Sequence, residues 1–140
     1  LLMAKKNTYA AANNKAESCR MNSQDYRYED KNGFTYLDSY LGGECFAGEE
    51  AVWLHEKPVW SMNYAGRVIG ENFSGDFLKE VLMEVPANLP FRGPEIYTKG
   101  DYHYHCKADG GFVWFQGYEE IFYMNEKIYD CYFHGGTIRQ

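Results

Sequence analysis

Two pairs of adjacent glutamates have the residue types and spacing best suited to chemistry. Glu49-Glu50 and Glu119-Glu120 each lie in a run of strand-forming residues, and neighbouring residues of a strand point to opposite faces of a sheet. One glutamate of each pair therefore points inward. If the sheet curves around a cavity, Glu50 and Glu120 can face it together and hold a cation or act as general acid and base. The alternative is that each inward glutamate only hydrogen-bonds to a neighbouring tyrosine or turn.

Asp38 is a third candidate, because it shares a strand face with one phenylalanine and two tyrosines. A carboxylate among aromatic rings is costly to bury unless a partner compensates its charge. Either this face is open to solvent, or Asp38 has a specific partner, for which Arg92 in the turn Phe91–Pro94 is a candidate. Arg92 could instead bind an anionic ligand or lie in solvent.

The histidines offer weaker patterns. His103 and His105 share a strand face, and metal sites use that spacing. Cys106 points the other way and the sequence has no second close pair of ligands, so we predict an exposed strand face and no metal. His134 precedes two glycines and could contact a ligand or act as a base, but the sequence names no nucleophile for it. We predict no catalytic residues.

Aromatic side chains make up 18% of the chain and include 13 tyrosines. Rings on one strand face can stack on nucleobases, sugars or cationic compounds, although core packing explains the same rings. The rings that could line a pocket are Trp53, Trp60, Tyr64, Trp114, Tyr118 and Tyr132. Combined with the polar candidates, they predict a ligand site that needs no cofactor. Its residues are Asp38, Glu50, Trp60, Tyr64, Arg92, Trp114, Tyr118, Glu120 and His134.

The elements that must position these residues are mostly strands. Asn32-Gly33 can supply the positive φ angles of a hairpin turn between two aromatic runs. Other runs of aromatic and β-branched residues alternate with turn residues along the rest of the chain. The strand-like runs are 26–29, 34–40, 51–54, 58–64, 102–106, 112–115, 118–124 and 128–133.

One helix is well specified, over about residues 74–85. Ser74 can cap it, Asp76 lies in the first turn where the helix dipole favours negative charge, and Pro86 ends it. An apolar stripe along this helix predicts packing against the sheet. Alanines and lysines in residues 1–13 predict a short N-terminal helix, residues 14–24 a loop, and the prolines of 86–94 an irregular connector.

Residues 34–66 and 102–136 share an order of glycines, glutamates and hairpins. Seven positions separate Glu50 from Lys57, and seven separate Glu120 from Lys127. We interpret the segments as two copies of a three-stranded meander within one domain, residues 1–140, which would bring equivalent residues together around a pseudo-twofold axis. The alternative is that glycine-rich turns and aromatic strands resemble one another by chance.

These elements predict an α+β fold. It would be a twisted antiparallel sheet of about seven strands, built from the two related meanders, with one main helix at about 74–85 and a short N-terminal helix.

Charge and hydropathy argue against nucleic-acid-binding, membrane and secreted proteins. The net charge of −6 disfavours nonspecific contact with nucleic acid. The chain has no apolar run long enough for a membrane span. The apolar stretch at its start is too short for a signal peptide. We therefore expect a cytoplasmic protein that binds neither DNA nor membrane directly. The four cysteines form no C-x-x-C pair, which predicts free, mostly buried thiols.

Several separated strings resemble an uncharacterised bacterial family, a domain of unknown function (DUF5680-like). They are Tyr40–Gly43, Gly48–Trp53, Pro58–Tyr64, Phe73–Leu78, Pro90–Pro94, Gly117–Glu120 and Phe133–Gly136. The resemblance covers about residues 1–138 and implies no catalytic residues. Members of that family stand alone or follow a helix-turn-helix DNA-binding domain, a pattern that this chain lacks.

Our leading hypothesis is a small-molecule-binding or effector-sensing domain without catalysis, linked through the resemblance to transcriptional regulation. One alternative is a small enzyme, a hydrolase or lyase that uses glutamate and His134 in an aromatic pocket. Another is an acidic protein-interaction module, and a homodimer is open under each hypothesis. The ligand in the leading hypothesis is a small molecule of unknown identity.

Overall fold

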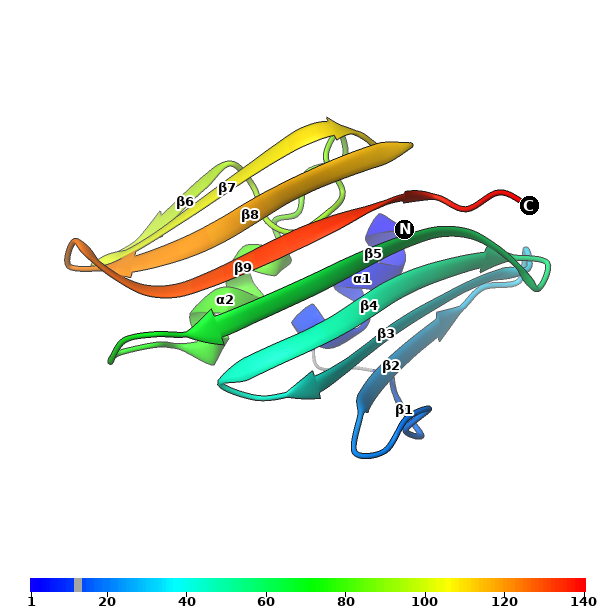
Figure 1. Cartoon of the computed structure of the whole chain (residues 1–140), viewed down its shortest axis with the longest axis horizontal. Helices are drawn as coiled ribbons and strands as arrows, with labels where there is room; N and C mark the ends of the chain where they lie inside the picture. Colours follow the sequence, from blue (N-terminus) through cyan, green and yellow to red (C-terminus); the bar gives the residue numbers. More distant parts are fainter. Residues whose placement is uncertain (12–13) are drawn as a thin grey trace.

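A single antiparallel sheet forms one layer of the molecule, and the helical segments lie against one of its faces (Figure 1). The computed structural model describes residues 1–11 and 14–140. Nine strands pair in the order β1-β2-β3-β4-β5-β9-β8-β7-β6. They are β1 (Lys15–Ala16), β2 (Gln24–Glu29), β3 (Phe34–Gly42), β4 (Cys45–Leu54), β5 (Lys57–Val68), β6 (Ile96–Lys99), β7 (Tyr102–Gly111), β8 (Trp114–Tyr123) and β9 (Glu126–Thr137).

The prediction of about seven strands with one main helix is wrong, because the sheet has nine strands and the helices are short. The edge strands β1 and β6, of two and four residues, lie where no strand was predicted. Strands this short show too little alternation to stand out from loops. β8 joins the end of the predicted strand 112–115 to most of 118–124, because glycine at 117 does not interrupt the ladder, whereas Phe112 and Val113 lie in the turn before β8.

Two α-helices and one 3₁₀ segment cover the sheet: α1 (Leu2–Lys6), η1 (Tyr9–Ala11) and α2 (Gly75–Leu82). The predicted cap of α2 is confirmed, because the Ser74 hydroxyl accepts a hydrogen bond from the Phe77 backbone N–H at 3.1 Å. The helix ends three residues before its predicted end, since Val85 precedes a proline and is disfavoured in helical conformation. The predicted N-terminal helix ran to residue 13, and positions 12 and 13 lie outside the described residues. Within the described part of the chain, neither helix has the length and apolar character to cross a membrane.

The order of β2–β5 on one side of the central β5–β9 pair matches that of β6–β9 on the other, and β1 is an additional edge strand without a counterpart (Figure 1). On each side, a hairpin closes with two residues of positive φ, at 49° and 69° in residues 55–56 and at 48° and 68° in residues 124–125. A register shift lies shortly before each turn, at Val52/Trp53 and at Ile121/Phe122. Counted from these turns, Glu50 and Glu119 occupy equivalent positions.

The sheet has a covered face, which packs against α1, α2 and the connector of residues 83–95, and an open face. Trp60, Met62 and Tyr129 are buried on the covered face, as their period-two spacing requires. The connector contributes Phe91, whose ring stacks on Phe115 with centroids 3.7 Å apart. This apolar packing surrounds several charged side chains that the same face also buries.

Candidate functional site

Five charged side chains lie between the sheet and the helical layer, each at most 8% exposed. They are Lys5, Asp38, Glu50, Arg92 and Glu119. They come from α1, β3, β4, the connector and β8, which are far apart in the sequence. Because a buried charge is costly unless it is paired and hydrogen-bonded, the partners of each group define this charged cluster.

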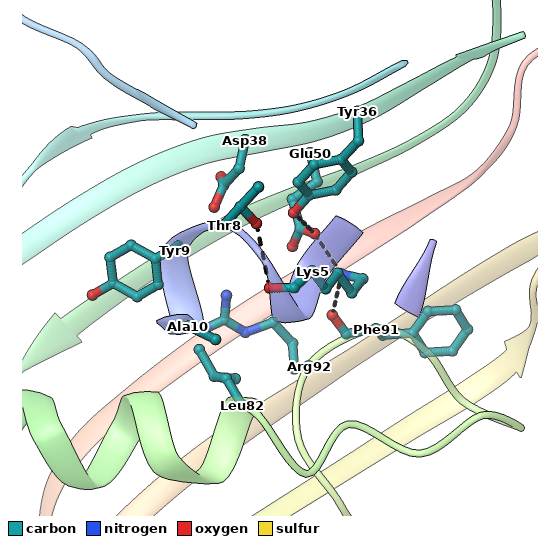
Figure 2. A pocket seen from close by; sticks show the side chains of 10 residues that line it. All are labelled: Lys5, Thr8, Tyr9, Ala10, Tyr36, Asp38, Glu50, Leu82, Phe91 and Arg92. Carbon is teal, nitrogen blue, oxygen red and sulfur yellow. Dashed lines mark hydrogen bonds and ion pairs between the residues drawn. The ribbon is translucent and has the colours of Figure 1, made fainter. Parts of the chain in front are cut away.

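Glu50 is neutralised by Lys5. The Lys5 ammonium donates to Glu50 Oε1 at 2.5 Å and to the Phe91 carbonyl oxygen at 2.8 Å (Figure 2). The Tyr36 hydroxyl donates to the same Oε1 at 2.5 Å. Burial lowers the pKa of Lys5, although the adjacent Glu50 favours the charged ammonium. The pair therefore joins α1 to the middle of the sheet.

Glu119 is neutralised by Arg92. The guanidinium Nε and Nη2 donate to the two carboxylate oxygens at 2.7 and 2.9 Å, a bidentate pair. The hydroxyls of Tyr104 and Tyr129 donate to Glu119 at 3.0 and 2.7 Å. Burial works against the charge on Arg92, but Glu119 beside it raises the arginine pKa overall. The guanidinium carbon also lies 5.2 Å from the ring centroid of Tyr64.

Asp38 differs from both glutamates, because no Lys, Arg or His within residues 1–11 and 14–140 forms an ion pair with it. It accepts a hydrogen bond from the Tyr64 hydroxyl at 2.5 Å through Oδ1. Burial, together with the negative charge of Glu50, raises the pKa of Asp38 to about 7. Figure 2 shows the Arg92 guanidinium pointing toward the Asp38 side of the cavity. Asp38 is therefore a buried carboxyl group that titrates near neutral pH.

Two cavities share Tyr9, Asp38 and Arg92 in their walls. The small cavity, of about 30 Å³, also touches Lys5 and Glu50 (Figure 2) and has room for one or two waters. The large cavity has a volume of about 130 Å³, close to that in which an engineered apolar site holds benzene. Its aromatic wall consists of Tyr9, Tyr40, Phe46, Tyr64 and Phe73.

A comparison with protein families gives one match. The family described as a domain of unknown function (DUF5680) matches residues 38–138. The chain belongs to this family. No curated protein and no solved structure matches the chain. The predicted family resemblance is thus confirmed, and the functional argument for this DUF5680 domain depends on its geometry.

The family match covers only part of the site. Asp38, Glu50, Arg92 and Glu119 fall within residues 38–138 of the DUF5680 domain. Lys5 and Tyr9, which complete the charged cluster and the cavity wall, precede the matched segment. The site therefore combines the matched sheet with the segment that comes before it.

The structure brings together only part of the predicted site. Asp38, Tyr64 and Arg92 line the large cavity and Glu50 the small one, whereas Trp60 is packed in the core. The other predicted residues lie away from both cavities. They are Trp114, Tyr118, Glu120 and His134, which alternate with buried residues of β8 and β9 and so belong to the open face. Trp114 is 81% exposed there.

The buried glutamate of the second hairpin is Glu119, which the sequence prediction missed in favour of Glu120. Glu119 lies in register with Cys106 and Cys131 on the covered face, and Glu120 lies opposite His105 and Asp130 on the other. Period-two alternation from the apolar residues at 115 and 121 would have identified position 119. Lys5 and Tyr9 were also missed, and no local sequence signal places α1 and η1 against Glu50.

The remaining polar candidates lie outside the cluster. Arg92, considered as a partner of Asp38, pairs with Glu119 instead. His103 and His105 are exposed on β7, and within residues 1–11 and 14–140 no group of three His, Cys, Asp or Glu side chains is arranged to hold a metal ion. The four cysteines are free, but Cys19 and Cys45 are exposed rather than buried.

Proposed function

We propose that this DUF5680 domain binds a small molecule in the large cavity and acts without catalysis. The observation that carries the proposal is a cavity of about 130 Å³ with an aromatic wall, into which two buried charged side chains, Asp38 and Arg92, project. Ligand sites are commonly concave and apolar, with a few polar groups that fix orientation. The cavity is smaller than those that hold drug-sized molecules, so the ligand is of the order of a single ring with a short substituent.

The construction of this cavity supports a role in effector sensing. Its wall combines β3, β4 and β5 with Tyr9 of η1, Leu78 of α2 and Arg92 of the connector. A molecule bound there contacts the sheet and the helical layer together. It would therefore stabilise their packing by an amount that grows with the logarithm of 1 + L/Kd, where L is the free ligand concentration, which gives a binding event a structural consequence.

Thermal denaturation tests the proposal. We expect a library of single-ring compounds to contain ligands that raise the melting temperature in a concentration-dependent way. Val68→Phe, which adds a ring in the wall of the large cavity, should abolish the shift, whereas Trp114→Ala on the open face should leave it unchanged. A library without any stabilising compound, or ligands whose effect survives in Val68→Phe, would contradict a site in this cavity.

The cellular setting is a further part of the proposal. We propose that the domain senses its ligand in the bacterial cytoplasm, as part of a transcription regulator whose DNA contacts are made elsewhere. The family resemblance supports the regulatory role, and the net charge of −6 supports the absence of direct DNA contact. A mobility-shift assay with duplex DNA at low salt should give no complex with this chain.

A second candidate function, an interaction module, is favoured by one observation. Trp114 and Tyr132 are 81% and 61% exposed, and Tyr118 and Tyr132 lie side by side with ring centroids 6.2 Å apart. Clustered exposed rings favour an interaction surface, and a homodimer through the open face is the simplest assembly. Sedimentation velocity over a range of concentrations would detect it, and Trp114→Ser should weaken it.

The enzymatic alternative finds no such support. His134 is exposed on β9, whereas the adjacent Phe133 is buried on the other face. Glu50 and Glu119 lie on the covered face, where lysine, arginine and tyrosine hydrogen bonds occupy them. Of the two predicted glutamates, Glu50 therefore lies on the other face from His134. Glu120 shares the open face with His134, but it lies in register with Asp130, whereas His134 lies opposite Gln116.

We also propose that the two hairpin units are copies of one ancestral unit. Three features support this: the matching strand order of β2–β5 and β6–β9, the matching turns, and the contact of Tyr36 with Glu50 in one unit and of Tyr104 with Glu119 in the other. The copies differ in the cation that neutralises each glutamate. In this arrangement Arg92 pairs with one unit and faces the cavity of the other.

A further inference from the structure

We infer that the ligand of the large cavity is a small primary or secondary amine, bound as its ammonium cation with Asp38 as the anionic partner. This inference rests on the proposed binding function and names the chemical class of the ligand. It is carried by the pairing of charges inside the molecule, by the composition of the cavity wall and by the cavity's volume.

The charges of the cluster do not balance. Two cations, Lys5 and Arg92, directly contact two carboxylates, Glu50 and Glu119. The third carboxyl, Asp38, is 6% exposed and receives only the hydroxyl of Tyr64 among the side chains of residues 1–11 and 14–140. A cation within hydrogen-bonding distance of Asp38 would compensate the remaining negative charge and recover part of the desolvation cost.

The cavity wall suits a cation better than an anion. The faces of aromatic rings attract positive charge, and five rings line this cavity, those of Tyr9, Tyr40, Phe46, Tyr64 and Phe73. Among the described residues, Arg92 is the one cation that lines it, and its charge is already compensated by the bidentate pair with Glu119. An anionic ligand would therefore meet Asp38 and the ring faces without a free positive partner.

Hydrogen bonding and volume narrow the class further. Asp38 accepts the hydrogen bond of the Tyr64 hydroxyl through Oδ1. Its other carboxylate oxygen has no side-chain donor among residues 1–11 and 14–140. An ammonium group with N–H bonds can donate to that oxygen, whereas a quaternary ammonium cannot. A volume of about 130 Å³ corresponds to roughly six to eight non-hydrogen atoms, by comparison with a cavity that holds benzene.

Calorimetric titration at pH 7.5 with three single-ring compounds of similar size tests the inference: benzylamine, benzyl alcohol and the slightly larger benzoate. We expect benzylamine to bind at least about tenfold more tightly than benzyl alcohol, and benzoate to bind least. Val68→Phe should abolish the binding of all three, because it fills the cavity. Asp109→Asn, at an exposed position of β7, is the matched control. It should bind the three compounds in the same order of affinity as the wild-type protein.

Asp38→Asn separates charge from shape. The amide oxygen can still accept the Tyr64 hydrogen bond, so benzyl alcohol should bind as to wild type while the preference for benzylamine disappears. Equal affinity for amine and alcohol in the wild-type protein, preference for benzoate, or an amine preference that survives in Asp38→Asn would overturn the inference and leave the proposed binding function standing. If none of the three compounds and no library compound binds in a manner sensitive to Val68→Phe, the binding function fails as well.

Discussion

Asp38 is buried like Glu50 and Glu119, yet in the part of the chain that the structure describes it lacks the direct cation that each of them has. Its carboxyl is kept inside the molecule by the Tyr64 hydroxyl and the surrounding rings. A core residue selected only for stability would be apolar at this position, because replacing buried polar groups by well-packed apolar ones is often neutral or stabilising. The cost of Asp38 therefore favours a functional explanation.

That cost gives a pH-dependent prediction for Asp38→Asn. The carboxyl pKa is about 7 in the folded protein, against an ordinary value of 3.8, because of burial and Glu50. The proton on Asp38 thus stabilises the fold fully below pH 4, and this contribution is lost as the pH rises through 7, by up to about 4 kcal/mol. Asp38→Asn removes this loss, so the variant should gain stability over wild type at pH 8 and lose most of that advantage at pH 5.

Urea denaturation at the two pH values measures the difference. The other groups around Asp38, among them Lys5, Tyr9, Glu50, Tyr64 and Arg92, are present in both proteins, and so the comparison isolates the carboxyl. Asp109→Asn should show no such pH dependence. An equal difference between Asp38→Asn and wild type at pH 5 and pH 8 would refute the assignment.

Lys5 supplies a second prediction at this scale. Lys5→Met leaves Glu50 buried with only the Tyr36 hydroxyl, and an uncompensated buried charge costs roughly 3–5 kcal/mol. Adding Glu50→Gln should recover much of this loss, since the charge is then gone. Equilibrium unfolding of the single and double variants measures it, with Lys6→Met on the same helix as the control. A decrease in the free energy of unfolding below about 0.5 kcal/mol in Lys5→Met would contradict a stabilising role of the Lys5–Glu50 pair.

At the scale of elements, α2 forms one wall of the large cavity through Leu78, and its start depends on one hydrogen bond. Ser74→Ala removes the acceptor for the Phe77 N–H and should cost about 1 kcal/mol. Ser74→Asp keeps an acceptor and adds a charge that the helix dipole favours, so it should retain wild-type stability. Thermal unfolding compares the two variants, and equal losses in both would argue against the cap.

Local patterns predicted the elements that depend on local physics. The antiparallel strands and the cap at Ser74 follow from residue types and short-range spacing. The edge strands β1 and β6 were missed because their pairing, not their composition, makes them strands. The pairing of β5 with β9 brings together residues some 70 positions apart in the sequence, for example Tyr64 and Phe133. No local sequence signal specifies this pairing.

The candidate site was predictable only in part, for the same reason. Asp38 and Tyr64 were identified from their strand faces, and they do share a cavity. Glu120 was chosen because it lies seven positions before Lys127, as Glu50 lies seven positions before Lys57. The hairpin turn and the register shift instead make Glu119 the buried equivalent of Glu50. Lys5 entered the site through the docking of α1, which is a tertiary event that the sequence of the helix does not encode locally.

At the scale of the whole molecule, one sheet carries a thin helical layer on a single face (Figure 1). The central strands β5 and β9 are paired on both edges, whereas α1 spans only five residues. Local opening is easiest where few backbone hydrogen bonds hold a segment. We therefore expect the seam between α1–η1 and the sheet to open more easily than the central strands, and both cavities lie along it.

This arrangement predicts where a ligand changes local stability. Hydrogen exchange, followed by mass spectrometry, should be fast in residues 2–11 and slow in β5 and β9 without ligand, because the central strands open only with the whole molecule. Saturating benzylamine should slow exchange around Tyr9, which lines the large cavity, far more than in the β6–β7 edge, which does not. In Val68→Phe the compound should have no effect on either segment. Uniform slowing across all strands would mean that the ligand stabilises the fold globally rather than closing this seam. Slowing confined to β8, with none around Tyr9, would place the ligand away from this seam.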